Sequence, residues 1–151
     1  MTPYNVSYEM LHEDVTNYGI YKIPDHLKDS LDFIVGVSRG GLLPAIILSH
    51  LYNIPLMPVQ YSSQLGNGDK NTHVLIPEFA RNTNILLVDD LADSGNTLKE
   101  LANIFTAKGV NAKTFVIYYK ESSVYQPDYF VHRVGADFPW IVFPYEYVYN
   151  D

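Results

Sequence analysis

The sequence predicts a single α/β domain in which a mostly parallel, twisted sheet carries helices on both faces. Apolar β-forming runs alternate with helix-like segments, and two of these runs end in loops of small or polar residues just before a helix begins. Of the 151 residues, 47% are hydrophobic and 18% are charged, a composition typical of one globular core. We therefore expect residues 1–151 to form one domain.

The first half of the chain begins with a helix and then starts a βαβ unit. Four large residues recur at helical spacing: Tyr8, Leu11, Val15 and Tyr18. Gly19 follows them and is a typical end of a helix. They predict a helix over about residues 6–18. A strand over 32–37, a glycine-containing loop over 38–41 and an apolar helix over 42–52 follow.

The middle of the chain continues the same alternation. A short strand is expected over residues 55–61, and the polar, aperiodic stretch that follows, about 62–74, is expected to be a mobile loop. The run 84–88 reads as a buried strand, the next helix ends near Gly109, and another strand covers 113–119. The tail beyond residue 124 is rich in aromatic residues and prolines, which favours extended segments and turns.

Charge and composition narrow the class of ligand. The formal net charge is -7 with only 10 Lys and Arg residues, so no positive field is available for nucleic acid. The chain has no cysteine, no signal-like N-terminus and no apolar run long enough to cross a membrane, so we expect a cytoplasmic protein that binds neither membranes nor nucleic acid. The five histidines have no metal-ligand spacing.

The most informative segment joins the strand at 84–88 to the following helix. A P-loop is excluded because Leu42 and Leu43 follow the glycines at 40 and 41, and the G-x-G-x-x-G pattern of dinucleotide-binding folds is absent. A calcium loop beginning at Asp89 would place Leu91 at a ligand position. Another explanation is needed for the adjacent acids of this segment.

The chemistry of this segment suits a ribose phosphate. Asp89 and Asp90 offer acceptors for ribose hydroxyls or for a hydrated magnesium ion. Backbone amides and hydroxyls at a helix N-terminus, where the helix dipole favours an anion, come from Ser94, Gly95, Asn96 and Thr97. The plainer alternative is that Asp93 or Ser94 only caps the helix while the paired acids end a strand in solvent.

Residues 88–97, Val-Asp-Asp-Leu-Ala-Asp-Ser-Gly-Asn-Thr, resemble the phosphoribosyl-diphosphate motif of the type I phosphoribosyltransferases. The resemblance implies that fold, with a small hood built from about residues 1–20 and 121–151. It implies that Asp89 and Asp90 hold the ribose 2- and 3-hydroxyls, that Asp90 lies nearest the cofactor Mg²⁺, and that the phosphate is held by Leu91, Ala92, Asp93, Ser94, Gly95, Asn96 and Thr97.

The same resemblance assigns a pyrophosphate site and a flexible loop. Ser38, Arg39 and Gly40, followed by Gly41, match the pyrophosphate loop of the family, and a guanidinium suits phosphate oxygens. The mobile stretch 62–74 corresponds to the loop that closes over the reaction centre. Lys70 within it is a further candidate ligand of pyrophosphate.

The C-terminal third resembles the small bacterial xanthine-guanine phosphoribosyltransferases, which have a strand-end lysine and a W-I-x-x-P-[WY]-[DE] tail like residues 140–146. The resemblance implies that Lys120 donates to the purine 6-oxo group, Trp140 stacks on the ring and Ile141 contacts its edge through side chain and backbone. Asp93 is then the candidate general base and handles the purine N7 proton.

We therefore expect a purine salvage enzyme that transfers ribose 5-phosphate from 5-phosphoribosyl 1-diphosphate to guanine, xanthine or hypoxanthine, and that forms a homodimer or homotetramer. A phosphoribosyltransferase for another base remains an alternative, as does a non-catalytic nucleotide sensor on the same fold. Lys120 and Trp140 argue against the first alternative, and the net charge and Asp93 argue against the second.

Overall fold

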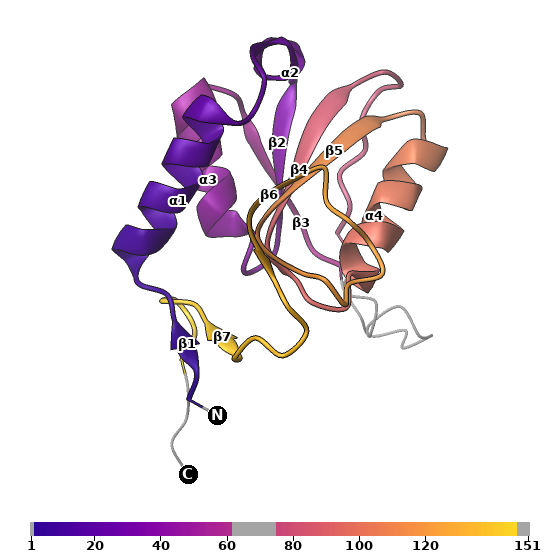
Figure 1. Ribbon diagram of the computed structural model, residues 1–151. Coiled ribbons are helices and arrows are strands. Elements are labelled where there is room, and N and C mark those ends of the chain that lie inside the picture. The colour runs from indigo at the N-terminus through magenta and orange to yellow at the C-terminus, as the bar shows by residue number, and fades with distance from the viewer. Residues whose placement is uncertain (1, 62–74, 148–151) are drawn as a thin grey trace.

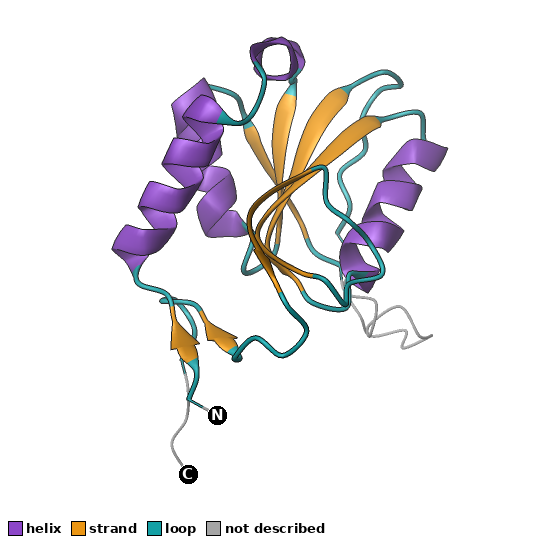
Figure 2. Ribbon diagram, in the orientation of Figure 1, coloured by secondary structure: helices purple, strands orange, loops and turns teal. Residues whose placement is uncertain are grey.

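The chain folds as an α/β domain with a single central sheet (Figures 1 and 2), as the sequence predicts. The computed structural model describes residues 2–61 and 75–147. The helices are α1 (Tyr8–Tyr21), α2 (Asp25–Ser30), α3 (Leu42–Tyr52) and α4 (Asn96–Ala107). The strands are β1 (Tyr4–Asn5), β2 (Phe33–Val37), β3 (Leu56–Val59), β4 (Asn84–Ala92), β5 (Asn111–Lys120), β6 (Tyr129–Val134) and β7 (Ile141–Val142).

The central sheet has five strands in the order β3-β2-β4-β5-β6, and every neighbouring pair is parallel. Helices α1 and α3 cover one face and α4 covers the other (Figure 1). Alternate residues of a strand serve opposite faces: Leu86 packs in the cluster that contains α1 and α3, whereas Leu87 packs in the cluster that contains α4. The predicted layers are confirmed.

Strand β4 is longer than the expected strand over 84–88. It continues to Ala92 because β5 still pairs with it there, Leu91 opposite Tyr118 and Ala92 opposite Tyr119. On its other side, the pairing with β2 ends at Val88. Asp89 and Asp90 therefore stand inside a strand that has a neighbour on one side only.

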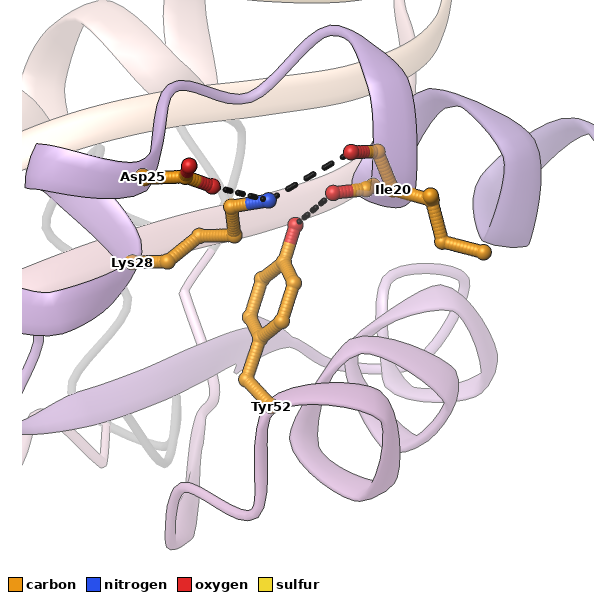
Figure 3. A network of polar contacts seen from close by, with 5 residues as sticks. Ile20, Asp25, Lys28 and Tyr52 are labelled. Atoms are coloured by element: carbon orange, nitrogen blue, oxygen red, sulfur yellow. Dashed lines mark hydrogen bonds and ion pairs between the residues drawn. The ribbon is translucent and has the colours of Figure 1, made fainter.

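The predicted end of the first helix at Gly19 is wrong, because α1 continues to Tyr21. A Cβ on Gly19 would lie 2.8 Å from Leu51 Cδ2 and 3.0 Å from Leu48 Cδ2, both on α3, so the glycine lets the two helices approach closely. The Tyr52 hydroxyl then donates to the Gly19 carbonyl oxygen at 2.8 Å (Figure 3). The Lys28 ammonium, 3.0 Å from an Asp25 carboxylate oxygen, donates to the neighbouring Ile20 carbonyl.

The two ends of the described chain form a second, two-stranded sheet. Strands β1 and β7 run parallel, with Tyr4 opposite Ile141 and Asn5 opposite Val142, and they lie beyond the lower end of α1 in Figure 1. The expected mobile loop over 62–74 lies outside the described residues. No helix of the described ranges is long and apolar enough to cross a lipid bilayer.

Candidate active site

The candidate site lies where the sheet reverses its winding. From β2 the chain passes through α3 to β3 on one side, whereas from β4 it passes through α4 to β5 on the other side. Because α3 and α4 cover opposite faces, the connections that leave the carboxyl ends of β2 and β4 run to opposite faces of the sheet, and the space between such connections is the usual ligand position in parallel sheets. Both motif loops identified in the sequence, 38–41 and 93–95, lie at this edge.

Two neighbouring carboxylates occupy the β4 side of this space. Asp89 Oδ1 accepts a hydrogen bond from the Asp90 backbone amide at 2.8 Å. Burial, followed by the charge of Asp90, raises the pKa of the Asp89 carboxyl well above its usual range. A bound cation, or hydroxyl donors from a sugar, would lower the free energy of the charged form of this pair.

The loop over 38–41 approaches β4 closely enough to require glycine. A Cβ on Gly41 would lie 2.8 Å from the Val37 carbonyl oxygen and 2.9 Å from Asp89 Cα. One on Gly40 would lie 2.6 Å from the Asp90 carboxyl carbon. Ser38 donates its backbone amide to Val59 at 2.8 Å. The expected pyrophosphate loop and the paired acids are therefore in direct contact.

Tyr145 joins these two parts of the site and was given no role by the sequence. Its hydroxyl lies 2.6 Å from Asp90 Oδ2 and 3.0 Å from the Gly40 carbonyl oxygen. The phenol ring stacks on Phe143 with centroids 5.7 Å apart and planes at 2°. Burial and the charge of Asp90 raise the pKa of the Tyr145 hydroxyl far above its usual range, so it remains a hydrogen-bond donor.

The expected phosphate loop begins at Asp93, because Leu91 and Ala92 belong to β4. Gly95 precedes α4 in a left-handed conformation, with φ 83°, and no side chain caps the helix. The plainer reading of Ser94 as an N-cap is therefore not supported, although its hydroxyl accepts a weak bond from the Asn96 amide at 3.3 Å. Thr97 follows in the first turn.

A segment after β5 supports this loop from behind. The Val124 amide donates to the Ser94 carbonyl oxygen at 2.8 Å. A Cβ on Gly95 would overlap Ser123 Oγ and would lie 2.9 Å from the Tyr125 amide nitrogen. The phosphate loop thus has little room to move toward residues 123–125.

Lys120 and Asp93 form an ion pair, with Lys120 Nζ 3.1 Å from Asp93 Oδ1. The parallel register explains the contact: Ala92 is opposite Tyr119, so the next residue of each strand end is also adjacent. The lysine side chain is 16% exposed and the aspartate side chain 65% exposed, so a ligand can reach the pair. These two residues belong to separate sequence motifs, and the sheet brings them together.

Trp140 lies at a cavity of about 1160 Å³ whose lining includes Arg39, Gly40, Asp90 and Tyr145. Its side chain is 66% exposed, and its carbonyl oxygen accepts a bond from the Tyr4 amide at 2.8 Å. Ile141 is only 1% exposed and belongs to the core cluster beneath α1 and α3. In this conformation its side chain is not available to the edge of a base, although its backbone lies beside Trp140.

The remaining expectations for the site concern Lys70 and magnesium. Lys70 lies outside the described residues. Among the described residues no group of three or more His, Asp or Glu side chains is arranged to hold a metal ion. A magnesium ion would therefore depend on Asp90, with Asp89 beside it, and on oxygens of the substrate; paired carboxylates with few protein ligands suit this hard cation.

Comparisons with known proteins identify the family of this chain. A family model described as phosphoribosyl transferase domain matches residues 7–150. The xanthine-guanine phosphoribosyltransferase of Idiomarina loihiensis is 31% identical over 145 residues, covering 93% of this chain and 85% of that protein. The adenine phosphoribosyltransferase of Campylobacter fetus is 31% identical over 105 residues, covering 58% of each.

A solved structure extends the comparison to three dimensions. The purine phosphoribosyltransferase from Pyrococcus horikoshii Ot3 has a TM-score of 0.80 and 26% identity, covering 100% of this chain and 99% of that one. The acidic segment at the carboxyl end of β4, the glycine loop beside it and the family match over nearly the whole chain lead to one assignment. This chain belongs to the phosphoribosyltransferases, a family of glycosyltransferases.

Proposed function

We propose that this chain is a purine phosphoribosyltransferase specific for 6-oxopurines. It transfers ribose 5-phosphate from 5-phosphoribosyl 1-diphosphate to N9 of guanine, xanthine or hypoxanthine and releases pyrophosphate. The observation that carries the proposal is the accessible ion pair between Lys120 and Asp93 at the open end of β4 and β5.

The ion pair matches one edge of a 6-oxopurine. Lys120 offers hydrogen-bond donors only, and Asp93 as a carboxylate offers acceptors only. A 6-oxopurine that carries its proton on N7 presents the opposite arrangement, an acceptor at O6 beside a donor at N7. Adenine has an amino group in place of O6, and the N–H donors of that group would face the N–H donors of Lys120 with no acceptor between them. Trp140, on the side of the cavity, is available to stack on the base.

The other substrate fits the remaining residues. Asp89 and Asp90 accept hydrogen bonds from the ribose hydroxyls, and the uncapped N-terminus of α4 with the loop over 93–96 receives the 5-phosphate. Arg39, exposed at the cavity, binds the pyrophosphate group. Magnesium bound at Asp90 would supply positive charge beside the departing pyrophosphate.

The chemistry then needs one bond made, one broken and one proton moved. The bond from the anomeric carbon to the pyrophosphate oxygen breaks, and its electron pair leaves with pyrophosphate. The base N9 forms the new bond to that carbon, and the proton on N7 passes to the Asp93 carboxylate. Arg39 stabilises the charge that develops on the leaving group, where a fixed cation is most effective.

The names of related proteins support a purine and leave the base to be tested. Two relatives named xanthine-guanine phosphoribosyltransferase match 93% and 95% of this chain at 31% and 30% identity, and two others of that name match 75% of it, whereas the adenine phosphoribosyltransferase matches 58%. The broader coverage favours a 6-oxopurine, in agreement with Lys120.

The test is pyrophosphate release from 5-phosphoribosyl 1-diphosphate and Mg²⁺ with guanine, xanthine, hypoxanthine, adenine and orotate. We expect turnover with at least one of the first three and little with the others. Lys120→Gln should lower kcat/KM for that base by about 10²-fold, because a buried contact to the 6-oxo group is lost. Lys113→Gln, a change on an exposed residue near the start of the same strand, is the matched control.

Preferred turnover of adenine would overturn the assignment of Lys120. Absence of pyrophosphate release with every base, from a folded protein that still binds nucleotides, would favour the non-catalytic sensor.

A further inference from the structure

We propose that Tyr145 is a positioning residue for 5-phosphoribosyl 1-diphosphate: its hydroxyl holds the Asp90 carboxylate against the loop over 38–41. This inference rests on the function proposed above and adds a residue to it. Tyr145 lies in the C-terminal segment, far along the chain from both groups that its hydroxyl contacts.

The contact to Asp90 is the dominant one. A phenol has one proton, and its oxygen lies 2.6 Å from Asp90 Oδ2 but 3.0 Å from the Gly40 carbonyl oxygen. The shorter distance is typical of a hydroxyl that donates to an ionised carboxylate. Tyr145 therefore fixes one oxygen of Asp90 and with it the orientation of the carboxylate that is expected to meet a ribose hydroxyl or a cation.

The hydroxyl is held in place by packing rather than by a flexible side chain. The Tyr145 ring lies parallel to and offset from that of Phe143, which is 2% exposed and packs edge-on against Tyr118 in the core. The turn that carries both rings is closed by two bonds, from the Glu146 amide to the Phe143 carbonyl at 3.1 Å and from the Phe143 amide to Glu146 Oε2 at 3.2 Å. Little ordering is then needed when substrate binds.

A neutral donor suits this position better than a cation. Asp89 and Asp90 must keep their negative charge to attract magnesium and to accept from the ribose, and a lysine in place of Tyr145 would neutralise it. The hydroxyl orients one carboxylate and leaves the net charge unchanged. It also joins the sugar-binding strand to the loop assigned to pyrophosphate, so the ribose and the pyrophosphate of one substrate meet a pre-arranged site.

The test compares Tyr145→Phe with the wild-type chain. The ring remains to stack on Phe143, so the fold is retained while the hydroxyl is lost. We expect the KM for 5-phosphoribosyl 1-diphosphate to rise about tenfold, equivalent to about 1.4 kcal/mol, with kcat and the KM for the base changed less than twofold. Calorimetric titration of the same substrate with Mg²⁺ should show the same tenfold loss without catalysis.

Tyr52→Phe is the matched control. The partly buried Tyr52 hydroxyl donates to the Gly19 carbonyl oxygen at 2.8 Å, between α1 and α3 (Figure 3), and Tyr52 is not among the residues that line the cavity of the site. Its loss should lower the melting temperature without changing either KM. A second test is the pair Tyr145→Phe and Asp90→Ala: once Asp90 is absent, removing the hydroxyl should add less than twofold to the loss of substrate affinity.

Each outcome bears on one of the two proposals. If the wild-type chain neither binds 5-phosphoribosyl 1-diphosphate nor releases pyrophosphate, the proposed function fails. If the wild-type chain is active and Tyr145→Phe leaves that KM unchanged, only the role of Tyr145 fails. A lower KM in Tyr145→Phe would also overturn it, because Tyr145 would then compete with substrate for Asp90. If the losses of substrate affinity caused by Tyr145→Phe and Asp90→Ala were additive in the double variant, Tyr145 would act independently of Asp90 and its proposed positioning role would fail.

Discussion

Gly95 provides the sharpest test of how the phosphate loop is built. Replacing it with alanine places a Cβ on a residue at φ 83°, where L residues are strained, and drives that Cβ into Ser123 Oγ and to 2.9 Å from the Tyr125 amide. The strained backbone lowers the free energy of unfolding by about 1 kcal/mol, after allowing for the smaller entropy of the unfolded alanine chain. The close contacts of the new Cβ lower the free energy of unfolding by about 2 kcal/mol more.

Gly109 offers the matched control at the other end of α4. It also has a positive φ, 77°, but its Cβ would meet only the guanidinium end of Arg81, a flexible side chain. Gly109→Ala should therefore show the backbone term alone, about 1 kcal/mol. For a chain of this size we expect melting temperatures lowered by about 2–4 °C in Gly109→Ala and by about 6–12 °C in Gly95→Ala.

Thermal denaturation and substrate titration together test whether the phosphate loop packs closely against residues 123–125. Only Gly95→Ala should weaken binding of 5-phosphoribosyl 1-diphosphate, because only there is the loop displaced away from these residues. Adding Ser123→Ala to Gly95→Ala should recover part of both losses, since it removes the overlapping hydroxyl. Equal destabilisation by the two glycine substitutions, with substrate binding intact, would refute the close contact between residues 94–95 and 123–125.

Two further predictions concern the acids. Asp93→Asn should lower kcat by about 10²-fold while the KM for 5-phosphoribosyl 1-diphosphate stays within about twofold, measured by steady-state pyrophosphate release; unchanged kcat would remove Asp93 as the general base. Asp89 has a pKa raised in the folded chain, so its protonated form favours folding and that stabilisation is lost as the pH rises through the raised pKa. In metal-free buffer at pH 8, the melting temperature of Asp89→Asn should therefore be higher than that of the wild-type chain, and the difference should shrink at lower pH. A lower melting temperature for the variant at pH 8 would contradict the raised pKa of Asp89.

The layers of the fold could be predicted because the sequence alternates between two periodicities. The errors have identifiable causes in tertiary contacts. Gly19 has a strong tendency to end a helix, but close packing on α3 and the bond from Tyr52 keep α1 intact beyond it. The run of apolar residues ends at Val88, whereas β4 continues because β5 supplies backbone partners for Leu91 and Ala92.

Part of the site could also be predicted, because that part lies in one continuous stretch of the sequence. Asp89, Asp90 and the loop over 93–97 are contiguous, so their chemistry can be recognised locally. The ion pair between Lys120 and Asp93 needs the register of β4 with β5, which follows only from the folded sheet. Tyr145 is the residue that the sequence could not assign, because no spacing rule relates it to Asp90, although it belongs to the tail motif over 140–146.

The pairing of β1 with β7 also bears on the order in which the chain can fold. Tyr4 and Ile141 stand near opposite ends of the chain, so their contact closes one of the longest loops available and incurs the largest entropic cost of closure. Strands β2 to β5 and their helices are joined by much shorter connections, so they can assemble before that loop closes. The segment that carries Trp140 and Tyr145 can join only afterwards. We therefore expect the part of the site carried by β2, β4 and β5 to form first during refolding, and the segment that carries Trp140 and Tyr145 to dock onto it in a later step.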